Sequence, residues 1–285
     1  MIASIVMLQN LINRKMKIDD RKKIGIMNQS ENRRYLIEEL LKEQPQYAHM
    51  QIPADAEGQK QLLRSLMNVR MPKKIRPEFL QVQDAYLQEA AKEKGVVTLA
   101  ELEASQPDLY IWKGDITRLQ VGAIVNAANS GMTGCYQPCH NCIDNCIHTY
   151  AGIQLRLACA DLMEKQGTEE PTGQAKIIPA YNLPCDYVIH TVGPIVQGRL
   201  TKNHEKLLAS CYRSCLQIAD EHDVKSIAFC CISTGVFMFP NDRAAEIAVE
   251  TVKHYKAETG SKIQVVFNVF KDIDEQLYHA LLEHK

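Results

Sequence analysis

The stretch "LYIWKGDITRLQVGAIVNAANS", Leu109 to Ser130, decides the fold class. It contains two short runs that are nearly continuous in apolar residues, 109–113 and 123–128, on either side of a polar turn. Strands that are covered on both faces have this composition. Three later runs of the same kind are "YVIHTVG" (187–193), "SIAFCCIS" (226–233) and "IQVVFNVF" (263–270).

Helical patterns separate these apolar runs. "NHEKLLASCYRSCLQIADEH" (203–222) and "NDRAAEIAVETVKHYKAETG" (241–260) carry apolar residues at helical spacing. Strands that alternate with helices predict an α/β fold with a layered sheet. Ligands on such sheets bind beyond the carboxyl ends of the strands. We therefore look for function in the loops that follow 109–113, 123–128 and 226–233.

The N-terminal part of the chain has a different texture. Residues 1–30 have a net charge of +4 and are predicted to form a loosely attached basic leader. Residues 31–105 show helical patterns, such as "ENRRYLIEELLKEQ" (31–44), and no strong strand. We expect a helical extension there, with no chemistry of its own, packed on an α/β domain that spans 106–285.

Composition narrows the function classes. The net charge of −1 gives no bulk attraction to nucleic acid. No apolar run reaches the roughly 18 residues of a membrane span. The first residues lack a basic n-region and an obvious cleavage site, so we expect a cytoplasmic protein in a reducing compartment. In that setting a tight Cys/His cluster indicates metal binding or catalysis.

The first and third loops offer binding groups. In "KGDIT", Asp115 either caps a short helix or accepts hydrogen bonds from an amino group such as that of adenine. In "CCISTGVFMFP", Ser233, Thr234 and Gly235 follow a buried strand and precede a helix. Backbone N–H groups in such a turn suit a diphosphate, although a plain connection would have the same composition.

The second loop carries Asn126 and Asn129 and then a dense cluster. "GCYQPCHNCIDNCIH" (134–148) holds four cysteines and two histidines. Thiolate and imidazole suit zinc. Spacing alone leaves two sets open. A four-cysteine set would close the ion and make it structural, whereas three ligands would leave a position open for catalysis. The four-cysteine set comprises Cys135, Cys139, Cys142 and Cys146.

Together these pieces resemble the macrodomain family, which binds ADP-ribose on an α/β/α fold. The pieces, in the family's order, are "WKGDITRLQVGAIVNAANS", "IDNCIHTYAG", "TGQAKIIPAYNLPCDYVIHTVGP" and "ISTGVF". The glycine run of metal-free hydrolytic macrodomains is replaced here by "GCYQPCHNC". That replacement and the helical extension resemble the zinc-containing microbial branch, which hydrolyses protein-ADP-ribose. The resemblance implies a three-layer α/β/α macrodomain with a mixed central sheet.

The resemblance also implies a ligand set and a substrate position. One zinc ion per chain would be held by Cys135, His140 and Cys142, while Cys139 and Cys146 would only line the loop. Asp115 and the amide of Ile116 would hold adenine, and Asn129 would face the distal ribose. Asp144 matches the acid of the metal-free hydrolases and could act as general base, although it could also cap a helix. The amides that would cradle the diphosphate belong to Ser233, Thr234, Gly235, Val236 and Phe237. Met238 stands where many relatives have glycine, which puts the pocket wall there in question.

The implied function is zinc-dependent removal of ADP-ribose from mono-ADP-ribosylated protein side chains. The family branch also implies a lipoyl-carrier protein as substrate and a functional link to a sirtuin-type transferase. Three alternatives stay open: an O-acetyl-ADP-ribose deacetylase, a non-catalytic ADP-ribose-binding module with structural zinc, and a redox or metal-sensing module. His148 and His190 lie in apolar sequence, and we expect either satisfied core histidines or groups that support the site residues from behind. Cys211, Cys215, Cys230 and Cys231 are expected to be buried without chemistry.

Overall fold

The centre of the computed structural model, which describes residues 27–283, is a seven-stranded sheet. Its strands are β2 (Ala104–Gln106), β3 (Leu109–Lys113), β5 (Ala123–Ala127), β6 (Ala175–Pro179), β7 (Tyr187–Thr191), β8 (Ser226–Phe229) and β9 (Gln264–Val269). They lie in the order β2-β3-β9-β8-β5-β7-β6. The five inner strands are parallel, and β2 and β6 pair antiparallel at the edges. The sheet is therefore mixed, as predicted.

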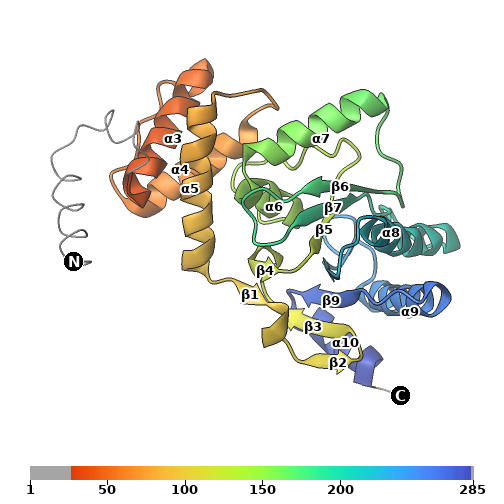
Figure 1. Cartoon of the computed structure of the whole chain (residues 1–285). Helices are drawn as coiled ribbons and strands as arrows, with labels where there is room; N and C mark the ends of the chain where they lie inside the picture. The colour runs from red at the N-terminus through yellow and green to blue at the C-terminus, as the bar shows by residue number, and fades with distance from the viewer. Residues whose placement is uncertain (1–26, 284–285) are drawn as a thin grey trace, which may run out of the picture.

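Helices cover both faces of this sheet (Figure 1). The helices are α6 (Ile143–Ala151), α7 (Ile153–Gln166), α8 (Lys202–Glu221), α9 (Asn241–Thr259) and α10 (Asp272–Glu283). α6 packs on β5 and α7 on β6, whereas α8, α9 and α10 form a continuous layer on the other side. The inner strands are fully buried at positions such as Val125, Ile189 and Val266. This three-layer α/β/α arrangement confirms the predicted fold class.

The N-terminal helices build a second apolar cluster of their own. They are α3 (Gln29–Glu43), α4 (Ala56–Val69) and α5 (Pro77–Lys94), with a short 3-10 helix at Pro45–Tyr47. Leu36, Leu40, Leu66 and Phe79 are at most 2% exposed within this cluster. In Figure 1 the three helices stand beside α6 and α7, at one side of the sheet. We call this unit the extension.

The segment that joins the extension to the sheet is not purely helical. β1 (Val97–Thr98) pairs in parallel with β4 (Leu119–Gln120), and β2 joins the main sheet. Residues 1–26 of the predicted basic leader lie outside the described residues, and α3 begins at Gln29. No helix within 27–283 combines the length and the apolar composition that a membrane crossing requires.

The predicted inner strands all occur, with ends that differ from the expected ones by at most four residues, but β6 and α7 were not predicted. Because the inner strands are parallel, their carboxyl ends share one edge of the sheet. The loops after β3, β5 and β8 leave from this edge.

Candidate functional site

The first loop fixes Asp115 from both sides. Its Oδ1 accepts hydrogen bonds from the Thr117 amide at 3.0 Å and the Thr117 hydroxyl at 2.6 Å, so the predicted cap exists. Its Oδ2 forms an ion pair with Lys94, the last residue of α5. Burial alone would raise the pKa of Asp115, but Lys94 and Thr117 hold it below its ordinary value. The carboxylate thus stays charged at the end of β3.

The third loop is a tight turn with unused amides. The Thr234 and Phe239 amides donate to backbone carbonyls within the turn, at 3.3 and 3.0 Å. The amides of Gly235, Val236 and Phe237 have no acceptor among the described residues. Such an array of N–H groups before a helix can hold an anion.

Two buried features shape this turn. Ser233 has a φ of 66° and a buried hydroxyl without a hydrogen-bond partner in the described chain. A Cβ on Gly193 would lie 2.1 Å from that hydroxyl oxygen, so only glycine allows the approach. Met238 has a φ of 54° and is 61% exposed, so its side chain points to solvent and does not close the turn.

The second loop positions one buried carboxylate. Asp144 is 6% exposed in the first turn of α6, and its Oδ1 accepts from Asn126 Nδ2 at 2.8 Å. Its Oδ2 accepts from Asn129 Nδ2 at 3.3 Å. Burial raises the pKa of Asp144 to about 6, against the opposing effects of Asn126, Arg156 and Asn129. The alternative that Asp144 caps α6 is wrong, because Cys142 is the N-cap.

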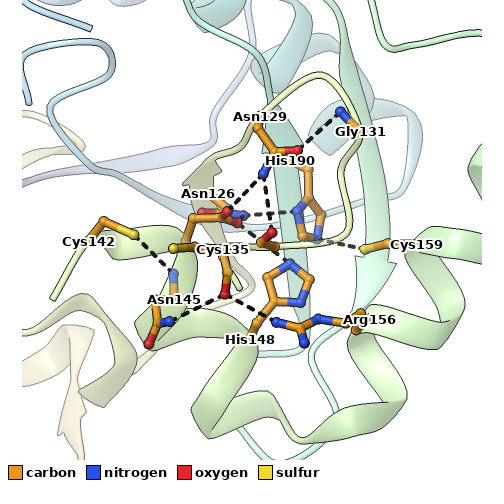
Figure 2. Close-up of polar contacts among 12 residues, drawn as sticks. Asn126, Asn129, Gly131, Cys135, Cys142, Asn145, His148, Arg156, Cys159 and His190 are labelled. Carbon is orange, nitrogen blue, oxygen red and sulfur yellow. Dashed lines mark hydrogen bonds and ion pairs between the residues drawn. The ribbon is translucent and has the colours of Figure 1, made fainter. Parts of the chain in front are cut away.

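Asn129 links this carboxylate to the rest of the loop. Its Nδ2 also donates to the Gly134 carbonyl at 3.3 Å, and its Oδ1 accepts from the Gly131 amide at 3.1 Å. Figure 2 shows Asn126 and Asn129 converging from the end of β5. The predicted pair of Asn129 and Asp144 is therefore brought together.

Three cysteine and histidine side chains of the same loop also converge. The ligand atoms of Cys135, His140 and Cys142 lie within 4.8 Å of one another, and Cys135 Sγ is 3.6 Å from His140 Nδ1. Two ligands of one tetrahedral zinc ion, at Zn–S of about 2.3 Å and Zn–N of about 2.0 Å, would be separated by a similar distance. The donor set and its spacing thus fit zinc. We call these three residues the loop group.

The other two cysteines of the loop face the extension. Cys139 Sγ lies 3.2 Å from Ser65 Oγ, and Cys146 Sγ lies 3.6 Å from the Arg64 guanidinium. Neither sulfur belongs to the loop group. This arrangement favours the three-ligand set over the four-cysteine set.

The thiol of Cys142 holds its proton firmly when no cation is present. Burial, followed by the neighbouring Cys135, raises the pKa of Cys142, while the Asn145 amide donates to its Sγ at 3.4 Å and opposes that shift. A coordinated divalent cation releases such a proton, since the thiolate is the ligand. Metal binding here would therefore release protons.

The extension holds the loop in place. Arg64 of α4 donates to the His140 carbonyl at 2.6 Å and to Asn145 Oδ1 at 3.0 Å. Asn68 of α4 accepts from the Cys139 amide at 2.9 Å. Arg156 of α7 donates to the carbonyls of Asn68, at 2.6 Å, and Cys135, at 3.2 Å. None of these three residues was predicted to matter.

A second Cys/His group lies in the core behind Asp144. His148 of α6, Cys159 of α7 and His190 of β7 are 4%, 0% and 0% exposed, and their ligand atoms also lie within 4.8 Å of one another. We call these three residues the core group. His148 is not a satisfied core histidine, because neither ring nitrogen has a hydrogen-bond partner in the described chain, which leaves the alternative of a group that supports a site residue. Its Nε2 lies 3.6 Å from Asp144 Oδ1, which the i, i+4 spacing could have indicated.

Comparison with known proteins places these features in a family. The Macro domain family matches residues 125–248. A protein-ADP-ribose hydrolase of Treponema medium is 60% identical over 90% of this chain and all of its own length. A protein-ADP-ribose hydrolase of Staphylococcus aureus strain MSSA476 is 49% identical over 86% of this chain and 92% of its own.

A solved structure shows the same fold with a ligand. The Trypanosoma brucei macrodomain in complex with ADP-ribose is 27% identical, with a TM-score of 0.61. The match covers 74% of this chain and 93% of that one.

Proposed function

The chain belongs to the macrodomain family, and from that premise we propose that it hydrolyses the bond between ADP-ribose and a modified protein side chain, with one zinc ion bound by the loop group. One observation carries the proposal. The loop after β5 brings a three-ligand Cys/His group and a buried carboxylate, Asp144, to the edge of the sheet where ligands bind. The names of the relatives, protein-ADP-ribose hydrolase, support the same reaction.

ADP-ribose would lie along this edge. Asp115 and the amide of Ile116 would hold the adenine, which the charged carboxylate at the end of β3 supports. The amides of Ser233, Thr234, Gly235, Val236 and Phe237 would surround the diphosphate, and those of Gly235, Val236 and Phe237 are free to donate. Asn129 would face the distal ribose, beside the loop group.

The residues of the second loop would then carry out the cleavage. Asp144 orients the attacking water and accepts its proton, held in one orientation by two asparagine amides. The water oxygen adds to the anomeric carbon, and the bond from that carbon to the side chain breaks through an oxocarbenium-like state. The side chain leaves with the electron pair of that bond, and Asp144 returns the proton to it or to solvent. A bound zinc ion supplies Lewis acidity at a substrate oxygen or at a water. Three protein ligands leave one position for that contact.

The identity of the modified protein rests on resemblance alone. A lipoyl-carrier protein as substrate, a sirtuin-type transferase as the opposing enzyme and a cytoplasmic location stay predictions. Within residues 27–283, the free amides of Gly235, Val236 and Phe237 and the charged Asp115 support binding of the ADP-ribose moiety, which every such substrate contains.

The test is release of ADP-ribose from proteins modified through acidic, serine or arginine side chains. Zinc-loaded protein should release ADP-ribose from at least one linkage. A chelator should abolish release, and re-added zinc should restore it. Failure of the zinc-loaded protein on every linkage contradicts the hydrolase.

Two further measurements separate the alternatives. Calorimetric titration with ADP-ribose distinguishes a binding module from a metal sensor, which would show no affinity. Hydrolysis of O-acetyl-ADP-ribose in preference to every protein linkage would favour the deacetylase.

A further inference from the structure

The core group is a second candidate for a metal site, apart from the loop group. His148, Cys159 and His190 come from three different elements and are almost completely buried. By residue type alone they could hold a second metal ion. The hydrogen bonds of His190 decide whether its ring nitrogen can act as a ligand there.

Asn126 fixes the position of the His190 proton. Asn126 and His190 are direct partners in the parallel pair of β5 and β7, so their side chains lie on the same face. Asn126 Nδ2 is 2.8 Å from Asp144 Oδ1 and 3.1 Å from His190 Nδ1. An amide nitrogen carries two hydrogens and accepts none, so His190 Nδ1 must be the unprotonated nitrogen.

The opposite orientation of the Asn126 amide conflicts with its surroundings. It would place the amide oxygen against the Asp144 carboxylate, which also only accepts. Amide orientations are assigned from the network in this way. With Nδ1 as acceptor, the His190 proton is on Nε2, which faces Cys159 Sγ at 3.8 Å. A nitrogen that carries this proton is not free to bind a metal, so Asn126, His190 and Cys159 form a hydrogen-bond chain in place of a metal site.

We propose that His190 is a positioning residue that orients Asp144 through Asn126. This inference rests on the proposed function, in which Asp144 handles the attacking water. Each hydrogen of the Asn126 amide has one acceptor, so the amide cannot turn over. If His190 Nδ1 were removed, the second hydrogen would lose its acceptor, and only the hydrogen bond to Asp144 would hold the amide in position. Figure 2 shows this line of contacts from Asn126 through His190 to Cys159.

Two substitutions of nearly equal shape test the acceptor. His190→Asn can place its side-chain oxygen close to the present position of Nδ1, whereas His190→Leu has the same branching and no acceptor. We expect His190→Leu to lower kcat by up to about 100-fold with KM within about threefold of the wild type, as the misplacement of a reacting group does. His190→Asn should keep at least about a third of the wild-type kcat, because its side-chain oxygen can still accept the hydrogen bond from Asn126. Equal losses in both variants would overturn the inference.

A double-variant cycle separates positioning from general damage to the core. In an Asp144→Asn background, His190→Leu should lower the residual kcat less than about threefold, since the group it positions is already gone. A loss as large as that in the wild-type background would mean that His190 acts elsewhere. Thermal unfolding of both single variants controls for stability.

The tautomer gives a readout that needs no activity. Long-range 15N–1H NMR of the zinc-loaded protein at pH 7 should show His190 protonated at Nε2 and unprotonated at Nδ1. Protonation at Nδ1, or a second metal ion per chain that Cys159→Ala removes, would overturn the inference. If the protein proves to lack hydrolase activity while this tautomer is found, the proposed function fails but the hydrogen-bond chain stands.

Discussion

The loop group and the core group contain the same residue types, but the loop group is partly exposed and the core group is buried. In the loop group, the Cys142 thiol accepts one backbone N–H, from Asn145, and Cys135 Sγ lies 3.6 Å from His140 Nδ1. In the core group, His190 Nδ1 is already engaged by Asn126. Residue type therefore does not define a metal site. What matters is whether each lone pair is free and whether an ion can reach it.

The strongest test of which group binds the metal is to remove one sulfur from each group. Cys142→Ser should reduce bound zinc from one ion to none and lower kcat at least about 100-fold, because two ligands hold zinc poorly. Serine is a good N-cap, so α6 should begin as before. Zinc per chain by elemental analysis and kcat are the measurements.

Cys159→Ala is the matched control in the core group. It should keep the zinc and lower the free energy of unfolding by about 1–3 kcal/mol, as the loss of a fully buried side chain does. If Cys159→Ala lost the zinc while Cys142→Ser kept it, the assignment of the two groups would be reversed. A large fall in stability for Cys142→Ser alone would favour a structural zinc.

The second prediction concerns the carboxylate between the two groups. Asp144→Asn should lower kcat about 10²- to 10⁴-fold, the usual contribution of a general base. The zinc and the affinity for ADP-ribose should stay within about threefold of the wild type, since neither contact needs the negative charge. Calorimetry and elemental analysis check both. An unchanged kcat would exclude Asp144 as the base.

The sequence predicts the inner sheet well because its strands are almost continuous in buried apolar residues. It does not predict β6, where only Ile178 is buried. It also does not predict α7, whose buried face includes Arg156 between Leu155 and Cys159, so its apolar stripe is interrupted. Arg156 is buried because it donates to carbonyls of the extension and the loop, and no local pattern shows this.

The site is predictable where its residues lie close together in the sequence. Asp144, Asn129 and the loop group lie within one short stretch, so spacing and resemblance find them together. The support from Arg64 comes from a residue 76 positions before His140. The chain from Asn126 to His190 crosses two strands that are 64 positions apart. Such contacts depend on the fold and leave no periodic signal.

The third prediction tests the support of the loop group by the extension. Arg64→Met keeps the length of the stem but removes the donors to the His140 carbonyl and Asn145. Zinc affinity should fall about 10- to 100-fold, which is typical for the loss of a group that supports a metal ligand. Chelator competition measures it.

Lys60→Met on the same helix is the control, because its side chain is 53% exposed and contacts only Glu57 among the ion pairs of the described chain. It should leave zinc affinity unchanged. Equal affinity in the Arg64 and Lys60 variants would mean that the loop holds its shape without the extension.

The smallest effect is expected where the extension contacts the sheet away from both groups, at Lys94 and Asp115. The pKa of Asp115 is lowered in the folded chain, so its charge stabilises the fold at pH values above its unfolded pKa of about 3.9. This contribution is lost as the pH falls through the lower folded pKa. Lys94→Met should therefore lower the free energy of unfolding by up to about 1 kcal/mol at pH 7, since the pair is one-third exposed.

The difference between wild type and Lys94→Met should shrink below about pH 4, as the Asp115 charge is titrated. Both proteins are compared without metal, so that loss of the metal at low pH does not enter. Lys92→Met on the same helix removes an exposed pair with Glu89 and should have no measurable effect. Thermal unfolding between pH 3 and pH 7 gives both differences. A gap between wild type and Lys94→Met that stays constant with pH would mean that the contact of the Lys94 ammonium with the Tyr150 ring contributes the stability instead of the pair with Asp115. The Lys94 Nζ lies 3.8 Å from the centroid of that ring.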